Sequence, residues 1–184
     1  MRNPANLLTA YRIAAAPVIA VMALAGYRDA FFILLIVSYI TDLIDGPIAR
    51  RMGLASDKGA KRDSFADGST VLAGLLGLWL FEWETVRGEL AWILSFLAIY
   101  ATSAGFGLAK FRVLPAYHLY LSKIAASGAG LFVASLYLFG YSRIFFIAAL
   151  VLGMLANLET ILVTLRLKTF RADIGSIFRL REGE

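Results

Sequence analysis

Cysteine is absent from this chain of 184 residues, and histidine occurs only once, at position 118. The lack of cysteine excludes a disulfide framework and thiol chemistry. Charged residues are scarce as well, at 17% of the chain, whereas 60% of the residues are hydrophobic and the mean hydropathy is +0.74. Soluble domains rarely exceed one-half apolar residues. The composition therefore indicates a chain that is embedded in a membrane.

Six apolar segments follow one another, each close to the ~20 residues that a helix needs to cross a bilayer. They cover residues 5–26, 30–50, 63–82, 89–111, 119–139 and 143–166. The first segment resembles a signal peptide, but we expect an uncleaved span because the segments that follow are also apolar. The sequence therefore predicts an all-α integral membrane protein with six transmembrane helices, forming a single domain over residues 1–184.

The basic residues are unevenly distributed between the two predicted faces of the membrane. Thirteen of the 18 lie on the face that carries both termini and the 51–62 loop, and only Arg28, Arg87 and Arg143 lie on the other. The positive-inside rule then places both termini and that loop in the cytosol of a multi-pass cell-membrane protein. The net charge of +5 favours anionic lipid as a partner,. Nucleic acid is excluded as a partner because no basic patch is interleaved with aromatic residues.

The segment after residue 167 is too polar to span a membrane. Phe170, Ile174, Ile177 and Phe178 recur there at helical spacing among basic residues. This pattern predicts an amphipathic helix that lies in the cytosolic interface. A solvated tail is the alternative.

Two pairs of aspartates form the most informative feature of the sequence. Asp42 and Asp45 are three residues apart, and Asp63 and Asp67 are four apart, so on helices each pair lies on one face,. Both pairs lie at the predicted cytosolic ends of consecutive spans, and antiparallel helices would bring all four together. Carboxylates at membrane depth are costly and repel one another, so the cluster calls for divalent cations.

The ligand type narrows the choice of metal. A set of oxygen ligands without Cys or a nearby His favours Mg²⁺ or Mn²⁺, which complete their coordination with substrate phosphates. Two ions would suit a displacement at phosphorus in a diphosphate substrate. Among the neighbouring residues, Gly46 and Ala49 are small enough to let a ligand approach, and Arg50 can hold phosphate oxygens,. Ser56 offers a hydroxyl in the connecting loop, and Gly59 allows the chain to turn back into the third span. Taken alone, Arg50 is better explained as a positive-inside residue than as a functional one.

The complete pattern is Asp42-x2-Asp45-Gly46-x2-Ala49-Arg50-x8-Gly59-x3-Asp63-x3-Asp67. It resembles the signature of the CDP-alcohol phosphotransferases, with every specified position present. Asn6-x2-Thr9-x2-Arg12 is also similar to the opening of that family. The resemblance implies phospholipid synthesis in which a substituted phosphate passes from a CDP-linked lipid, usually CDP-diacylglycerol, to an acceptor hydroxyl with release of CMP. It also implies a homodimer.

Roles for individual residues follow from the same resemblance. Asp42, Asp45 and Asp63 would ligate the metal ions, and Asp67 would lie beside the second ion and act as general base. The residues expected at the CDP moiety are Gly46, Ala49, Arg50, Ser56 and Gly59, with Asn6 and Thr9 from the opening.

The acceptor is less well specified. The family uses glycerol 3-phosphate, inositol phosphate, serine, choline and other alcohols, and a phosphorylated acceptor would require cations outside the signature. The candidates are Arg12, Lys110, Arg112 and Lys123. The length of the chain makes glycerol 3-phosphate the leading acceptor, but the segment after Gly59 lacks the Asp-Pro-x-Ala-Asp-Lys pattern of that subgroup. Serine and inositol phosphate therefore remain alternatives.

Two other residues and two other functions remain open at this stage. His118 is expected at the surface or interface, and Glu159 either pairs with a basic residue of the bundle or is functional. A membrane prenyltransferase also binds diphosphate through paired Asp motifs, but those motifs lie further apart. An ion-binding transporter would require further acidic residues along a pore.

Overall fold

The computed structural model describes residues 4–52, 57–172 and 174–180. Six long helices account for most of them, and no strand occurs in these ranges. The helices are α1 (Pro4–Leu24), α2 (Arg28–Arg51), α3 (Asp57–Val86), α4 (Leu90–Phe111), α5 (Tyr120–Phe139) and α6 (Arg143–Arg166), with short 3-10 helices η1 (Arg87–Glu89) and η2 (Ile177–Arg179). The prediction of an all-α chain is confirmed.

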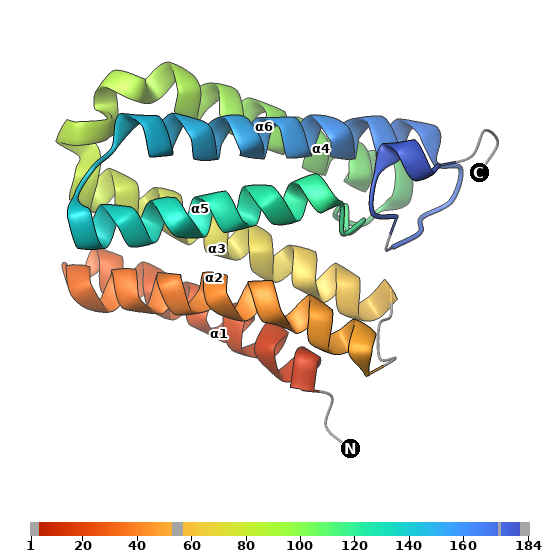
Figure 1. Cartoon of the computed structure of the whole chain (residues 1–184), viewed down its shortest axis with the longest axis horizontal. Helices are drawn as coiled ribbons and strands as arrows, with labels where there is room; N and C mark the ends of the chain where they lie inside the picture. The colour runs from red at the N-terminus through yellow and green to blue at the C-terminus, as the bar shows by residue number, and fades with distance from the viewer. Residues whose placement is uncertain (1–3, 53–56, 173, 181–184) are drawn as a thin grey trace.

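The six helices form two layers that lie against each other (Figure 1). Helix α1 packs against α2 and α3, whereas α6 packs against α4 and α5, and contact between α2 and α5 joins the layers. The N-terminus of α1 and the segment after α6 lie at the same end of the bundle as the C-terminus of α2, the N-terminus of α3 and the α4–α5 connection (Figure 1). Residues near the C-terminus of α2 and the N-terminus of α3 therefore meet at that end.

Aromatic residues hold the core at the opposite end of the bundle. Phe31 and Phe32 of α2 are almost completely buried and their rings meet edge to face, with centroids 5.1 Å apart. Phe31 lies directly on the backbone of Gly77, where an added Cβ would come within 1.9 Å of the ring. Glycine at this position therefore allows the close approach of α2 and α3, as small residues do between membrane helices.

The outer surface of the bundle carries many large apolar side chains, such as Leu131, Ile144 and Leu94, which are 61–79% exposed. Among the described residues, four segments are long and apolar enough to cross a membrane: Leu7–Leu24, Gly59–Phe111, Tyr120–Phe139 and Arg143–Arg166. The second of these contains both α3 and α4. The chain is thus a multi-pass helical membrane protein, while the count of six spans stays a prediction.

The end of the bundle away from the termini carries its basic residues in ion pairs. Arg28 pairs with Glu82 at 2.8 Å, and Arg143 pairs with Glu89 at 2.5 Å. Arg87, which is in η1, pairs with the exposed Glu84 at 3.1 Å. Each of the three basic residues at this end is therefore neutralised locally.

The prediction of an amphipathic C-terminal helix is wrong. Among the described residues after α6, the only helical element is the single turn η2. The segment instead folds back on the α4–α5 connection. Tyr120 N donates to Gly175 O at 2.7 Å, and Ile174 N donates to Tyr117 O at 3.0 Å. Gly175 has a φ of +80°, a left-handed conformation that interrupts a helix,.

Glu159 of α6 fixes the same segment. Its Oε1 accepts hydrogen bonds from Ser176 Oγ at 2.9 Å and from Ile177 N at 3.0 Å. Ile174 and Ile177 are buried against the bundle, whereas Phe178 is 94% exposed. The burial of Ile174 and Ile177 and the hydrogen bonds with the bundle outweigh the helical spacing of the apolar residues, because that spacing expresses only a local preference,.

Candidate active site

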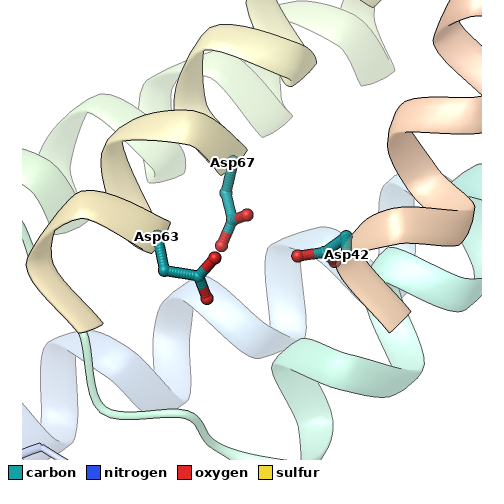
Figure 2. A group of neighbouring side chains, drawn as sticks. All are labelled: Asp42, Asp63 and Asp67. Carbon is teal, nitrogen blue, oxygen red and sulfur yellow. The ribbon is translucent and has the colours of Figure 1, made fainter. Parts of the chain in front are cut away.

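Three of the four signature aspartates converge at the end of the bundle that carries the termini. Asp42 comes from α2, and Asp63 and Asp67 come from consecutive turns of α3 (Figure 2). One carboxylate oxygen from each lies within 4.8 Å of the others. The i, i+4 spacing places Asp63 and Asp67 on one face of α3. Because α2 and α3 run antiparallel, that face meets Asp42.

Arg12 of α1 lies among these carboxylates. Its Nη1 donates to Asp42 Oδ1 and to Asp67 Oδ1, both at 2.5 Å, and its Nη2 donates to Asp63. The side chain is only 1% exposed, so the guanidinium is removed from water and depends on these partners,. The arginine therefore ties α1 to α2 and α3 through charge.

The residues present fit a divalent cation. Three carboxylates and one guanidinium leave a formal charge of about −2 on this group, and a doubly charged ion balances it,. The ligand atoms are all oxygens, which hard cations such as Mg²⁺ prefer. Among the residues that the structure describes, this is the group of acidic side chains close enough together to hold an ion.

A cavity of about 260 Å³ opens beside the aspartates and is called the polar cavity after the polar side chains in its lining. Asp42, Asp63 and Asp67 line it together with residues of α4, α5, α6 and the α4–α5 connection. Its other polar lining residues are Ser64, Tyr100, Ser103, Tyr117, His118, Ser122, Lys123, Asn157 and Thr160. The carboxylates therefore face a space that a polar molecule can enter.

His118 is a site residue that the sequence did not reveal, since its position in a connection favoured the surface. Its Nδ1 lies 4.0 Å from Asp63 Oδ2, and its side chain is 21% exposed. The residue has a φ of 47°, in the left-handed region that residues other than glycine rarely adopt,. Ser64 Oγ donates to Pro115 O at 2.7 Å and holds this connection against α3. Only the pairing of α3 with the connection brings the imidazole to the aspartates.

The four candidate acceptor residues occupy different places. Arg12 lies among the aspartates, and Lys123 lines the polar cavity. Lys110 Nζ donates to Thr164 O and Leu165 O, each at 2.9 Å, so it caps the C-terminal end of α6,. Arg112 ends α4 in a left-handed conformation with a φ of 58°. Neither Lys110 nor Arg112 belongs to the described lining of the cavities that reach the aspartates.

The candidate CDP-binding residues are only partly described. Thr9 is buried one turn before Arg12 on α1, and Gly59 lies in the first turn of α3. The remaining predicted residues fall outside the side chains that the structure describes: Asn6, Asp45, Gly46, Ala49, Arg50 and Ser56.

Comparison with known proteins gives one match. The family model for CDP-alcohol phosphatidyltransferase matches residues 2–167, which include all six helices and both aspartate pairs. No curated protein and no solved structure matches the chain. Members of the family transfer a phosphatidyl group from a CDP-alcohol in phospholipid synthesis. This chain therefore belongs to the CDP-alcohol phosphatidyltransferase family of enzymes, which transfer substituted phosphate groups.

Proposed function

We propose that this enzyme transfers the phosphatidyl group of CDP-diacylglycerol, or a similar CDP-lipid, to the hydroxyl of a small polar alcohol and releases CMP. The observation that carries the proposal is the convergence of Asp42, Asp63 and Asp67 on a cavity that opens beside them. The family match over most of the chain favours this chemistry over a prenyltransferase or an ion transporter.

The aspartates divide into two roles. Asp42 and Asp63, with Asp45 from the same signature, would hold two ions of Mg²⁺ or Mn²⁺, and Asp67 would lie beside the second ion. When bound, the metal supplies positive charge that stabilises the diphosphate and the departing CMP. This use fits the negative charge that remains on the cluster after Arg12 has paired.

Asp67 is the residue that we assign as general base. Its side chain is 47% exposed, compared with 19% for Asp42 and 13% for Asp63, so it is the carboxylate most open to an acceptor. The acceptor oxygen forms a bond to the β-phosphorus, and the bond from that phosphorus to the CMP oxygen breaks. The hydroxyl proton passes to the Asp67 carboxylate. Arg12 positions the aspartates through its three ion pairs.

The polar cavity is the proposed acceptor site. Lys123 and His118 line it with hydroxyl and amide side chains such as Ser122 and Asn157. A cationic side chain next to hydroxyl groups suits a phosphorylated alcohol, and glycerol 3-phosphate is the leading acceptor. Serine and inositol phosphate are the alternatives.

We also propose that the active site faces the cytosol and that the enzyme is a homodimer in the cell membrane. At the end of the bundle that holds the aspartates, the described residues include several basic ones, as the positive-inside rule requires of a cytosolic face: Lys61, Arg62, Lys110, Arg112 and Arg166,. At the other end, Arg28, Arg87 and Arg143 pair with glutamates. The dimer rests on the family resemblance.

The test is an assay of CMP release by the purified protein with Mg²⁺ and CDP-diacylglycerol. Glycerol 3-phosphate, serine, inositol, inositol phosphate and choline are offered separately, and we expect one of them to be used well above the others. Asp67→Asn should abolish release in a protein that still folds, as should excess EDTA. The matched control is Asp29→Asn, an exposed aspartate in the first turn of α2 at the opposite end. Full activity in Asp67→Asn or in EDTA would refute the mechanism, and release without acceptor preference would refute the assigned acceptor site.

A further inference from the structure

A second cavity, of about 240 Å³, lies between the two layers of the bundle and is lined by all six helices. Arg12, Asp42 and Asp67 line it at the active-site end, and Phe31 and Phe146 line it toward the opposite end. Between these ends the lining is mostly apolar. The cavity is thus an apolar extension of the active site into the interior of the bundle.

The dimensions of this inner cavity suit a hydrocarbon chain. Along α2 it extends from Asp42 to Phe31, and eleven residues of helix correspond to ~16 Å,. A cavity of ~150 Å³ with apolar walls already takes up benzene, and this one is larger. Small residues on three helices leave the space open: Gly74 on α3, Ala129 on α5, and Ala149 and Gly153 on α6.

Ser38 is one of several polar side chains in this lining, but unlike Thr70 and Asn157 it does not bond to a carbonyl of its own helix. Ser38 of α2 is completely buried, and its hydroxyl has no hydrogen-bond partner among the described residues. A buried hydroxyl without a partner is costly, so a ligand that placed an acceptor here would gain a hydrogen bond. Ser38 lines the inner cavity one helical turn below Asp42, which corresponds to ~6 Å along the axis,.

We propose that the inner cavity holds one acyl chain of the CDP-lipid donor and that Ser38 donates a hydrogen bond to the ester carbonyl of that chain. The inference rests on the proposed function, which places the donor diphosphate at the aspartates. In a diacylglycerol lipid, an ester carbonyl follows the phosphate by a few bonds and the hydrocarbon chain follows the ester. The inner cavity presents partners in the same order: Asp42, then Ser38, then Leu35 and Phe31.

The first test fills the inner cavity. Ala129→Leu adds three carbons to its wall, and Ala101→Leu adds the same atoms to an exposed position of α4. With a long-chain CDP-diacylglycerol, we expect Ala129→Leu to lower kcat/KM for the donor about tenfold, which corresponds to ~1.4 kcal/mol. With a short-chain donor, and in Ala101→Leu with either donor, we expect no loss. Equal loss with long and short chains, or no loss with either, would overturn the assignment.

The second test concerns Ser38. The wild-type protein should use an ester-linked donor better than the ether-linked donor of equal chain length, and Ser38→Ala should remove this preference. Ser95→Ala, which changes an exposed serine whose hydroxyl bonds to Ala91 O, should keep it. Retention of the ester preference in Ser38→Ala would refute the hydrogen bond to the carbonyl.

A binding measurement separates this inference from the proposed function. CDP-diacylglycerol with a photoreactive group in its acyl chain is bound to the full-length protein in nanodiscs, irradiated and mapped by mass spectrometry. We expect labels on cavity residues such as Leu75 and Ala129, reduced in Ala129→Leu. Labels confined to lipid-facing residues such as Leu131 and Ile144 would refute the chain site even if CMP is released. Absence of CMP release with every donor would refute the proposed function, while the labels would still report where the chain lies.

Discussion

Replacement of Arg12 by methionine tests whether the buried arginine holds the active-site end of the bundle together. The change keeps an unbranched side chain but removes the charge that pairs with Asp42, Asp63 and Asp67. Removal of one partner from a buried ion pair costs ~3–5 kcal/mol. Because Asp67 is 47% exposed and water screens part of its charge, we expect the lower end, about 3 kcal/mol,.

The assay is thermal unfolding at a fixed scan rate in EDTA and in millimolar Mg²⁺. For a chain of this size, 3 kcal/mol corresponds to a fall in the unfolding midpoint of ~6–12 °C. In Mg²⁺ the deficit of Arg12→Met should shrink, because a bound cation replaces part of the lost positive charge and stabilises the folded state. The control is Arg87→Met, whose pair with Glu84 is exposed on both sides and contributes at most ~1 kcal/mol,.

Two results would refute this reasoning. If Arg12→Met and Arg87→Met unfold at the same temperature in EDTA, Arg12 does not stabilise the carboxylates. If Mg²⁺ raises the midpoints of the wild type and of Arg12→Met by the same amount, the cation and the guanidinium do not act on the same charges.

Three further predictions concern positions outside the aspartate cluster. Lys123→Ala should raise the KM for the acceptor at least tenfold, because Lys123 lines the proposed acceptor cavity. The control, Lys110→Ala, should leave that KM unchanged. It should lower the stability of the fold by ~1 kcal/mol, because Lys110 caps the C-terminal end of α6,. Glu159→Ala should release the C-terminal segment, which limited trypsin digestion followed by mass spectrometry would detect as faster cleavage after residue 167, while unchanged cleavage would contradict the tether. Gly77→Ala should lower the unfolding midpoint, because its Cβ would overlap the Phe31 ring and overpacking costs ~1–3 kcal/mol,. Gly105→Ala, with open space at its Cβ, should not, and equal effects of the two changes would contradict the close packing.

The sequence by itself predicted the helices and the family of the enzyme. Apolar runs separated by glycine, proline and charged residues predicted five of the six helices to within two residues at each end, because hydropathy and length are local properties,. The third predicted segment, 63–82, was too short, since α3 begins at Asp57 and ends at Val86 with polar and charged residues at both ends. The Asp63-x3-Asp67 spacing fixed two carboxylates on one face of α3, and antiparallel connection of α2 and α3 followed from their short loop. These are features of neighbouring residues, so they required no knowledge of packing.

The tertiary structure decided which residues from distant segments meet. Arg12 appeared in the sequence as one of four acceptor candidates, and only the packing of α1 against α2 and α3 placed it among the aspartates. The α4–α5 connection places His118 near Asp63, and Lys110 donates hydrogen bonds to the last carbonyls of α6 instead of lying near the aspartates. The segment from Ile174 to Ile177 forms hydrogen bonds with Tyr117 and Glu159 instead of the predicted helix. Each of these outcomes depends on contacts between residues at least 17 positions apart, and the energies of such contacts are not encoded in any local pattern.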